Sequence, residues 1–575
     1  MAIIQPIVNI AEICAQRHVT QFILSPGSRC APLTLAFARH PQIDTRSIPD
    51  ERSAAFIALG IAVQSKQTVG LVCTSGTAVL NYAPAITEAY YQQVPLLVLT
   101  ADRPAEWIEQ QDGQTIRQRE VYGKHVKASF ELPVAYSHPD AEWHTYRIIN
   151  EAITLSQTYP CGPVHVNVPL REPLYPAANE EIIFDKGVRI IQPFKSEGIL
   201  AVEQWIQIRE QWEDYDNKLI VAGQYPYQPQ LVHVLRQIQT ELEVPVVADI
   251  IANLHMLPDA IRFQDMLLMQ KQEHVLASLK PDLLITYGNS VISKNLKLFL
   301  RKHKPALHWH IQPAGIPADP FQTLTHTLPV TPLYFFKTLF EDLDYQNFLS
   351  SDGPEAGTDY YAGWQKENQN AAKVFSSLFS PASFSEFEAV SEIMDRLPDE
   401  SILHLANSMP VRYANFISLQ PGQTVEVFAN RGTSGIDGST GTALGAALIT
   451  EKPVILLTGD MAFLYDRNSL WHNYVPKNLR IIVLNNHGGG IFRLLDGPAG
   501  QPELEEYFET RQRNKAALTA KDAGLDYYYC HTKEELHKQL TAFFDLSGGA
   551  KLLEIETDPA VNAGVYARFK QYFST

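Results

Sequence analysis

The sequence has little cysteine. Its 575 residues include five cysteines, an odd number, widely scattered and without a CxxC pair. Disulfide frameworks and thiolate metal sites need paired or closely spaced cysteines. The composition therefore disfavours both and is typical of proteins from a reducing compartment.

Long apolar runs are missing as well. No apolar run approaches the ~20 residues needed to span a bilayer. The N-terminal segment MAIIQPIVNIAEICAQRHV lacks the basic start of a secretory signal. We therefore expect a cytoplasmic protein that does not enter the membrane.

Positive charge is scarce. The chain has 47 Lys and Arg against 63 Asp and Glu, which gives a net charge of −16. Nucleic acids and anionic membranes require basic surfaces, so neither is an expected partner. Yet Arg29, Arg103 and Arg431 lie in Gly- or Pro-containing turns that follow apolar runs. Cations in such turns of an acidic protein indicate small anionic substrates.

Short apolar runs alternate with helical patterns along the chain, which is typical of doubly wound α/β domains. A chain of this length is expected to form about three domains. Residues 173–198 read as a linker, and a polar stretch at residues 350–370 leads to the last domain. We predict α/β domains at residues 1–185, 186–350 and 351–575. The expected strands are residues 19–24, 68–73, 94–100 and 164–168; 218–222, 244–248, 282–287 and 306–311; and 402–406, 424–429, 454–457, 481–484 and 552–555.

Two neighbouring strands of the third domain end in oxygen-bearing side chains. Gly459-Asp460 follows the first strand, and Asn485-Asn486-His487-Gly488 follows the second. Open α/β sheets bind ligands at the carboxyl ends of their strands. Asp460, Asn486 and the Gly488 carbonyl are hard oxygen donors of the kind that Mg²⁺ prefers. This spacing resembles the cofactor motif of thiamine diphosphate enzymes, although any α/β protein can carry Gly-Asp after a strand and Asn-Gly in a turn.

Glu51 opens a predicted helix within the segment DERSAAF. Acids are common in the first turn of helices because they complement the helix dipole, which is the plain structural interpretation. In a thiamine diphosphate enzyme, a carboxyl group at this place would instead bind the N1′ atom of the cofactor's aminopyrimidine and promote its imino form. The sequence leaves both interpretations open.

A series of motifs in one order makes the resemblance specific. They are SPGSR at 25–29, DERSAAF at 50–56, TSGTAV at 74–79, ADRP at 101–104, NSMPVR at 407–412, NRGTSGIDG at 430–438 and the Asp460/Asn486 pair, with GNSVISKN at 288–295 from the middle domain. Together they resemble the 2-succinyl-5-enolpyruvyl-6-hydroxy-3-cyclohexene-1-carboxylate synthases, a thiamine diphosphate family of menaquinone biosynthesis. The resemblance spans nearly the whole chain and implies pyrimidine-binding, central and diphosphate-binding domains.

The resemblance implies a transferase. The family decarboxylates 2-oxoglutarate and adds the resulting succinyl carbanion to isochorismate in a 1,4-addition, with thiamine diphosphate and Mg²⁺ or Mn²⁺ as cofactors. Similar enzymes place the cofactor between the first domain of one subunit and the third of another. A homodimer or homotetramer with active sites at the subunit interface is therefore implied.

The resemblance also assigns roles to individual residues. Glu51 would be the catalytic acid, and Asp460, Asn486 and the Gly488 carbonyl would hold the metal. Other cofactor-binding residues would be Ser408, Ile436, Gly459 and Ala462. Arg412 and Arg431 would bind 2-oxoglutarate, because guanidinium groups bind carboxylates bidentately. Isochorismate would contact Ser28, Arg29, Arg103, Gln114 and Lys294, with Ile491, Phe492 and Leu495 as an apolar wall.

Two positions depart from the family pattern. Asn295 stands where the family often has arginine, and His487 where a third asparagine is common. We assign His487 no role beyond the turn.

Other functions remain possible on sequence alone. Another thiamine diphosphate-dependent 2-oxoacid decarboxylase or ligase would have similar cofactor residues, although small neutral acceptors would not require Arg29, Arg103 and Arg431. A nucleotide-binding dehydrogenase or regulatory module would need a GxGxxG turn after a strand, and the glycines between Gly432 and Gly441 are not so spaced. A non-catalytic relative would be expected to have lost Glu51 or Asp460.

Overall fold

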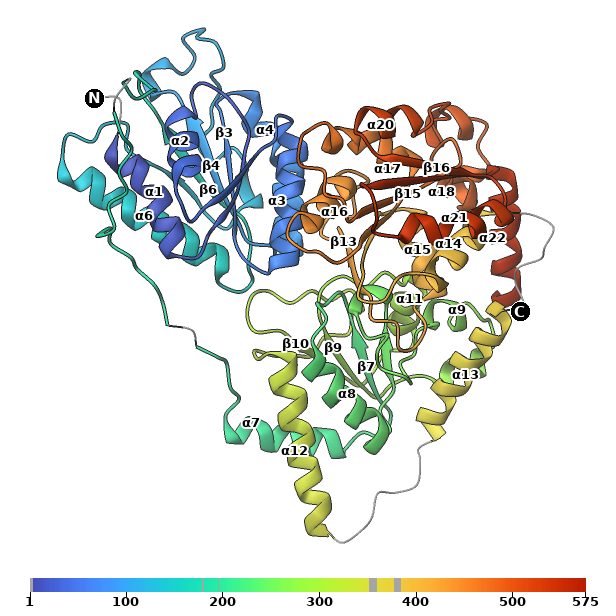
Figure 1. Cartoon of the computed structure of the whole chain (residues 1–575). Helices are drawn as coiled ribbons and strands as arrows, with labels where there is room; N and C mark the ends of the chain where they lie inside the picture. Colours follow the sequence, from blue (N-terminus) through green and yellow to red (C-terminus); the bar gives the residue numbers. More distant parts are fainter. Residues whose placement is uncertain (1–3, 178–179, 195, 351–358, 377–383, 575) are drawn as a thin grey trace.

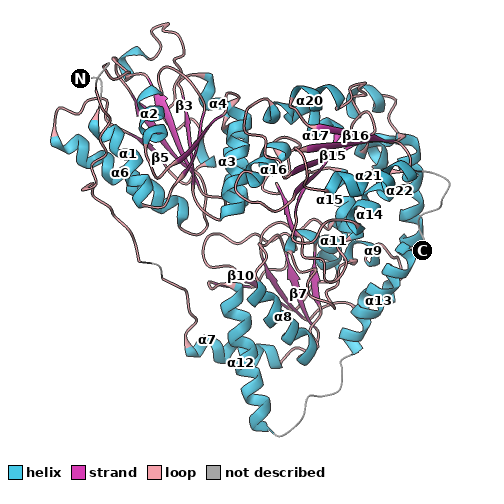
Figure 2. Ribbon diagram, in the orientation of Figure 1, coloured by secondary structure: helices cyan, strands magenta, loops and turns pink. Residues whose placement is uncertain are grey.

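The computed structural model describes residues 4–177, 180–194, 196–350, 359–376 and 384–574. They form three α/β units, which Figure 1 shows in blue, green and orange to red. Each unit contains one sheet of parallel strands packed against helices (Figure 2). The predicted fold class is therefore confirmed.

The first unit has a six-stranded sheet in the order β2-β1-β3-β4-β6-β5. Its strands are β1 (Gln21–Leu24), β2 (Asp44–Ser47), β3 (Val69–Cys73), β4 (Leu96–Asp102), β5 (Ser129–Glu131) and β6 (Val164–Pro169). Its helices are α1 (Gln5–Gln16), α2 (Ala31–Arg39), α3 (Glu51–Ser65), α4 (Thr77–Asn81), α5 (Ala83–Gln92) and α6 (Pro139–Gln157), with short 3₁₀ turns η1 (Ala105–Trp107) and η2 (Gly123–His125).

The second unit has a five-stranded sheet in the order β11-β10-β9-β7-β8. Its strands are β7 (Lys218–Ala222), β8 (Val246–Ala248), β9 (Leu283–Tyr287), β10 (Leu307–Ile311) and β11 (His326–Leu328). The accompanying helices are α7 (Val202–Glu213), α8 (Pro229–Glu241), η3 (Ile250–Ala252), α9 (Gln264–Leu267), α10 (Glu273–Ser278), α11 (Lys294–Lys302), α12 (Pro332–Ser350) and α13 (Asp359–Ser376).

The third unit has a six-stranded sheet in the order β13-β12-β14-β15-β17-β16. Its strands are β12 (Ile402–Leu405), β13 (Glu426–Ala429), β14 (Val454–Gly459), β15 (Leu479–Asn485), β16 (Asp526–Cys530) and β17 (Lys551–Glu556). Its helical segments are α14 (Glu386–Asp395), α15 (Met409–Ile417), α16 (Ser439–Ala447), α17 (Asp460–Asp466), η4 (Arg467–Leu470), α18 (Ile491–Leu494), α19 (Asp496–Ala499), η5 (Leu504–Phe508), α20 (Ala517–Asp522), α21 (Lys533–Phe544) and α22 (Pro559–Ser574).

The strands that the sequence analysis did not predict lie at the edges of the sheets. They are β2, β5, β11 and β16, and each contains exposed residues. The central strands are covered on both faces and therefore read as continuous apolar runs. These four edge strands are only partly covered and lack this signal.

The two connecting segments differ from each other. The described residues between β6 and α7 form no helix or strand, in agreement with the predicted linker at residues 173–198. The polar stretch at residues 350–370 is not an extended linker, because residues 359–376 form α13. Tyr360, Trp364 and Ala371 of this helix are buried at helical spacing among polar residues. Residues 351–358 lie outside the described part.

The third unit shares hydrophobic cores with both of the others. One core joins Phe299 and Trp364 to Phe387 and Leu405. Another joins Ile57 of α3 to Leu444 of α16 and Ile402 of β12. The three units are therefore held together by extensive apolar packing. Among the described residues, no helix is long and apolar enough to cross a membrane.

Helices α3 and α16 cross at glycines (Figure 1). A Cβ atom on Gly60 would lie 2.0 Å from the Thr442 carbonyl oxygen, and one on Gly445 would lie 2.1 Å from the Ile57 carbonyl oxygen. Backbone cannot move aside as a flexible side chain can. The absence of side chains at both positions therefore permits this contact between the first and third units.

Gly445→Ala is expected to destabilise the protein by about 1–3 kcal/mol, because the new methyl group overpacks the crossing. Thermal unfolding should show a midpoint lower by a few degrees. Gly363→Ala in α13 is the matched control, since its Cβ would have its closest contact at 3.9 Å, with Leu279 Cδ2. There the substitution should be neutral or stabilise by up to ~1 kcal/mol. Equal effects of the two substitutions would contradict the close crossing.

His404 of β12 gives the fold an acid sensitivity. It is 3% exposed, stacks on Phe428, and its Nε2 atom has no hydrogen-bond partner among the described residues. Burial lowers its pKa from 6.5 to about 3. Below pH 6.5 the unfolded chain therefore binds a proton that the folded chain does not, so stability falls as the pH falls through that window.

His404→Phe should remove this contribution. Relative to the wild type, the variant is expected to gain stability by up to about 1.4 kcal/mol for each pH unit between pH 6.5 and pH 4. Denaturant unfolding at several pH values measures the difference. A constant difference across the range would show that His404 titrates alike in the folded and unfolded states.

Candidate active site

The carboxyl ends of β14 and β15 form the floor of a cavity of about 230 Å³. In the sheet register Gly459 of β14 lies opposite Leu484 of β15, so the residues that follow each strand meet at one edge. The predicted residues that line this cavity are Ser408, Ile436, Gly459, Asp460, Ala462, Asn486, Gly488, Ile491 and Phe492. The structure thus brings together most of the residues predicted around the cofactor diphosphate. Leu495 is 46% exposed and lies just beyond α18, outside the lining.

Asp460 is the first residue of α17 and is 4% exposed. Its Oδ1 atom accepts a hydrogen bond from the backbone N–H of Met461 at 2.8 Å, and Oδ2 accepts one from Gln512 Nε2 at 2.7 Å. Burial raises the pKa of this carboxyl to about 6, against the lowering effect of its hydrogen bonds. A cation in the cavity would favour the ionised form.

Asn486 carries the clearest sign of a missing partner. Its Nδ2 atom donates to Glu386 Oε1 at 2.7 Å. Its Oδ1 atom is buried and has no hydrogen-bond partner among the described residues. An unsatisfied buried acceptor costs about 1–3 kcal/mol, so a ligand or ion is expected to satisfy it.

Glu386 was not predicted as a site residue. It opens α14, is 3% exposed, and lines the cavity beside Asn486. Burial raises its pKa to about 7, and the charge of Asp460 acts in the same direction. Glu386 accepts the amide N–H of Asn486, so the Oδ1 atom of Asn486 points away from Glu386. Residues outside the ligand set of a metal site orient the ligands in this way.

Glycines in the cavity wall pack closely against neighbouring residues. A Cβ atom on Gly490 would lie 2.5 Å from Asn486 Nδ2, and one on Gly488 would lie 2.7 Å from the Glu509 carbonyl oxygen. Ser408 has a positive φ of 76°, a conformation that non-glycine residues adopt at a cost and often at functional sites. Ile436 is 43% exposed at this cavity and is free to contact a ligand.

Glu51 lies outside this cavity. It is the first residue of α3, and its neighbour Asp50 caps the helix by accepting from Ser53 N at 2.9 Å. Asp50 is therefore the N-cap of α3, while Glu51 is the acid in its first turn. Glu51 is half-buried, and its side chain makes no hydrogen bond or ion pair with any residue that the structure describes.

The start of α3 contacts the far end of α17. Asn468 Nδ2 donates to Asp50 Oδ2 at 2.8 Å, and Arg52 Nη2 donates to the Tyr465 carbonyl oxygen at 2.6 Å. Asp460 lies at the opposite end of α17, about 9 Å away at 1.5 Å per residue. Within one chain, Glu51 therefore lies near the carboxyl end of α17 and outside the residues that line the Asp460 cavity.

The predicted isochorismate residues of the first unit lie around another cavity of about 340 Å³. Arg29 and Arg103 line it. Arg103 Nη1 donates to the Gln114 carbonyl oxygen at 3.0 Å, which fixes the chain at Gln114 beside this cavity. Ser28 is exposed and adjoins Arg29. The structure thus places Arg29 and Arg103 at one cavity, with Ser28 and Gln114 next to them but outside its lining.

Arg412 and Arg431 do not line the Asp460 cavity themselves, but each bonds a residue that does. Arg412 Nη1 donates to the Ser408 carbonyl oxygen at 2.6 Å, and Arg431 Nη1 donates to Asn407 Oδ1 at 2.7 Å. Burial lowers the pKa of both guanidinium groups. Lys294 is exposed at the start of α11 and lines none of the cavities described here.

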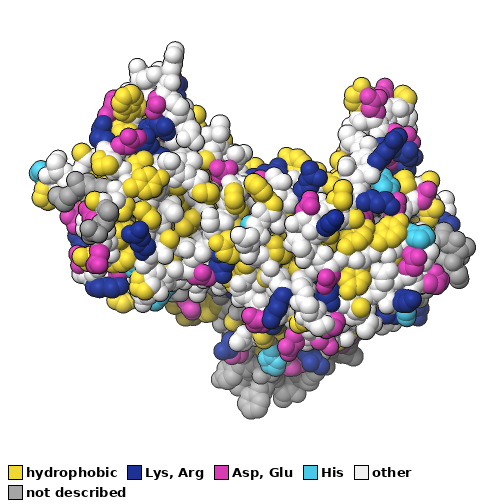
Figure 3. All heavy atoms as spheres, turned by 45° about the horizontal axis from the view of Figure 1, so that its top comes forward, with side chains coloured by type: hydrophobic (Ala, Val, Ile, Leu, Met, Phe, Trp, Pro, Cys, Tyr) yellow, Lys and Arg dark blue, Asp and Glu magenta, His cyan; other side chains and the backbone are white. Residues whose placement is uncertain are grey.

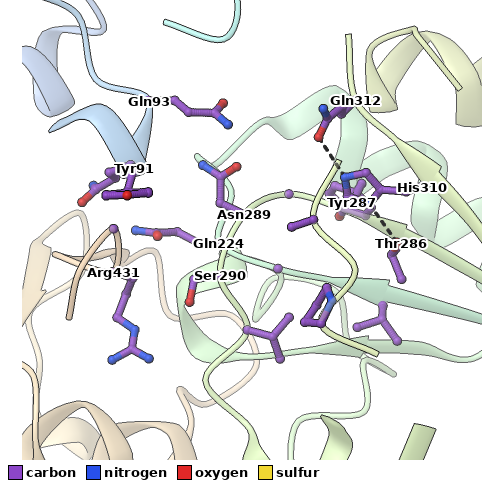
Figure 4. Close-up of a pocket in the computed structure, with 18 of the residues that line it drawn as sticks. Tyr91, Gln93, Gln224, Thr286, Tyr287, Asn289, Ser290, His310, Gln312 and Arg431 are labelled. Atoms are coloured by element: carbon purple, nitrogen blue, oxygen red, sulfur yellow. Dashed lines mark hydrogen bonds between the residues drawn. The ribbon is translucent and has the colours of Figure 1, made fainter. Parts of the chain in front are cut away.

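Arg431 also lines a cavity of about 320 Å³ where the three units meet. Figure 4 shows Tyr91 from the first unit, Arg431 from the third, and Gln224, Asn289 and His310 from the second around it. His310 bonds Thr286 and Gln312, as the dashed lines show. Arg431 therefore lies between two cavities.

The two departures from the family pattern have structural explanations. Asn295 Nδ2 donates to the Asp265 carbonyl oxygen at 2.8 Å, so this side chain faces the second unit's own backbone. His487 has a φ of 64°, as expected for a turn residue, and its Nε2 atom lies 2.8 Å from Glu556 Oε1.

Comparison with known proteins gives the family. A model of the N-terminal TPP binding domain of thiamine pyrophosphate enzymes matches residues 9–121, and a model of their C-terminal TPP binding domain matches residues 408–555. A 2-succinyl-5-enolpyruvyl-6-hydroxy-3-cyclohexene-1-carboxylate synthase from Cytophaga hutchinsonii is 45% identical over 567 residues, which cover 99% of this chain and 98% of the relative.

The chain belongs to this synthase family.

Other synthases of the family are also similar to this chain over nearly their full length. Those of Flavobacterium johnsoniae and Porphyromonas gingivalis are 38% and 36% identical, and the alignments cover 98% of this chain and 98% and 96% of the relatives. The synthase family resemblance predicted from the motifs is confirmed, and the protein is a thiamine diphosphate-dependent transferase. Glu51 falls within the N-terminal model and Asp460 within the C-terminal one.

Proposed function

We propose that the protein decarboxylates 2-oxoglutarate with thiamine diphosphate and joins the succinyl unit to isochorismate by 1,4-addition, as a step of menaquinone biosynthesis. The observation that carries the proposal is the buried, unpartnered Oδ1 of Asn486 beside Asp460, at the strand ends of a chain that matches this synthase family over its full length.

The residues of the Asp460 cavity fit the cofactor and its metal. The Asp460 carboxylate, Asn486 Oδ1 and the Gly488 carbonyl would hold Mg²⁺ or Mn²⁺, which in turn binds phosphate oxygens. Gly488 and Gly490 let the loop after β15 pack closely against Glu509 and Asn486, which holds the loop at the cavity. Ser408, Gly459 and Ala462 line the same cavity.

A second copy of the chain completes the site in this proposal. The chain's own Glu51 lies at the far end of α17 from Asp460 and outside the cavity lining, and in this proposal Glu51 of another copy reaches the Asp460 cavity. A homodimer, or a larger oligomer built from dimers, provides this second copy by symmetry.

Exposed hydrophobic side chains on α4, on α17 and just after η4 support this assembly. Leu80 on α4, Tyr465 on α17 and Trp471 after η4 are 47%, 53% and 62% exposed. Figure 3 shows a face hollowed between two raised parts, with hydrophobic side chains spread across it. Clustered exposed apolar surface marks interaction sites.

Each group of side chains has a distinct task. Bound thiamine diphosphate supplies the electron sink for decarboxylation. Glu51 would hold a proton at N1′ of the aminopyrimidine, and Ile436 would support the cofactor. Arg412 and Arg431 bind the carboxylate of 2-oxoglutarate. Arg29, Arg103 and Gln114 hold isochorismate, with Lys294 reaching it from the second unit and Ile491, Phe492 and Leu495 forming the apolar wall.

A general 2-oxoacid decarboxylase or ligase is the alternative. The cavity that contains Arg29 and Arg103 disfavours it, because a small neutral acceptor gains nothing from these cations. A cationic cavity suits an acceptor with carboxylates.

An assay with purified protein, Mg²⁺, thiamine diphosphate, 2-oxoglutarate and isochorismate tests the proposal. The adduct should form only when every component is present. Equally efficient turnover of pyruvate in place of 2-oxoglutarate would favour the alternative, and full activity without isochorismate consumption would contradict the proposed reaction.

A further inference from the structure

Three arginines converge on the cavity of the first unit from the ends of three strands. Arg29 follows β1, Arg103 follows β4, and Arg171 follows β6. These strands belong to one parallel sheet, with β4 and β6 adjacent. Arg171 belonged to none of the motifs, and the sequence alone gave it no role. Its position gives the cavity a third guanidinium group.

Arg29 and Arg103 are each paired with an acid, and each acid is more exposed to solvent than its arginine. Arg29 pairs with Glu172 at 3.2 Å and Arg103 with Asp112 at 2.5 Å; the two arginine side chains are 11% exposed, whereas Glu172 and Asp112 are 73% and 40% exposed. The cations are therefore fixed by the fold, while the carboxylates are free to move into solvent. Arg29 Nε is buried without a partner among the described residues.

Arg171 is held only loosely. Its Nη2 atom donates to Glu106 Oε1 at 2.5 Å, the single bond of its guanidinium to the described part of the chain, and the two side chains are 53% and 54% exposed. Exposed ion pairs contribute little to stability. Replacing the Glu106 carboxylate by a ligand carboxylate is therefore inexpensive.

We propose that Arg171 binds a carboxylate of the acceptor substrate together with Arg29 and Arg103, and that Glu106 occupies its guanidinium until the substrate arrives. The inference rests on the proposed function, because isochorismate carries two carboxylates. Trp107, which is 50% exposed at this cavity, offers an aromatic surface to the ring between them.

The arrangement of charge supports a dianionic ligand. Arg29 and Arg103 already donate to the Leu170 carbonyl oxygen and to Ser75 Oγ, which orients them but uses donors. A second carboxylate bound bidentately needs two further parallel N–H donors. Arg171, with a single exchangeable partner, supplies them.

Opposite effects of two substitutions test the role of Arg171. Arg171→Ala should raise the KM for isochorismate about 10-fold or more, because a charge-assisted contact is lost. Glu106→Gln should lower that KM roughly 2- to 5-fold, because it frees Arg171 from a competing carboxylate. If the ion pair were merely structural, both substitutions would break it and change KM in the same direction.

The matched control is Arg117→Ala. Arg117 is also paired with an acid, Glu109 at 2.5 Å, but is 79% exposed and lies outside the cavity lining, so its loss should leave both KM values unchanged. The KM for 2-oxoglutarate is the internal comparison, since damage to the fold would alter both constants. An inactive wild-type protein would refute the proposed function and this inference with it. An active wild type with an unchanged isochorismate KM in Arg171→Ala would refute only the inference.

Discussion

Glu51→Gln should lower turnover by about 100- to 10,000-fold, the range for loss of a positioned acid or base. Glutamine has the same shape but cannot share a proton with N1′ of the aminopyrimidine. The variant should still bind thiamine diphosphate and Mg²⁺, because the Asp460 cavity is untouched. Steady-state kinetics and cofactor retention after desalting measure the two properties separately.

The neighbouring acid provides the control for this variant. Asp50→Ala removes the helix cap and should cost about 0.5–2 kcal/mol of stability. Well below its unfolding temperature it should retain turnover. Near-wild-type turnover of Glu51→Gln would remove Glu51 from the mechanism, and a large loss in Asp50→Ala would indicate that the helix start matters only for folding.

Asp460→Ala should abolish retention of the metal and cofactor. It deletes the single charged group among the three proposed metal ligands, so the affinity for Mg²⁺ is expected to fall by at least about 100-fold. A Mg²⁺ titration followed by thermal shift in the presence of thiamine diphosphate measures this loss, since a bound ligand stabilises the folded state.

Glu386→Gln should weaken metal binding less than Asp460→Ala does. It preserves the shape of the group that orients Asn486 and should weaken metal binding by roughly 10-fold, the lower end for an outer-shell change. Wild-type Mg²⁺ affinity in Asp460→Ala would place the metal elsewhere. A greater loss in Glu386→Gln than in Asp460→Ala would make Glu386 itself the ligand.

The sequence predicted the elements whose residues follow a clear local hydrophobic pattern. Strands buried on both faces carry continuous apolar runs, so all central strands were found. Edge strands such as β2 and β16 are partly exposed and lack that pattern. The helix α13 was not predicted within the polar stretch at residues 350–370, because its buried Tyr360 and Trp364 are separated by polar residues.

The same limit applies to the candidate site. Asp460 and Asn486 follow adjacent strands, so their meeting could be inferred from the chain. Glu386 comes from a helix 100 residues before Asn486, and no local pattern links the two. Arg171 likewise acquires its importance only when β6 lies beside β4.

The central claim is that Glu51 of one copy and Asp460 of another form each active site. Mixing Glu51→Gln with Asp460→Ala under conditions that exchange subunits tests it directly. Half of the dimers in a statistical mixture are mixed and each has one intact site, so roughly a quarter of wild-type activity should return. If mixed dimers form, as shown by two affinity tags, and the mixture stays inactive, the shared site is contradicted.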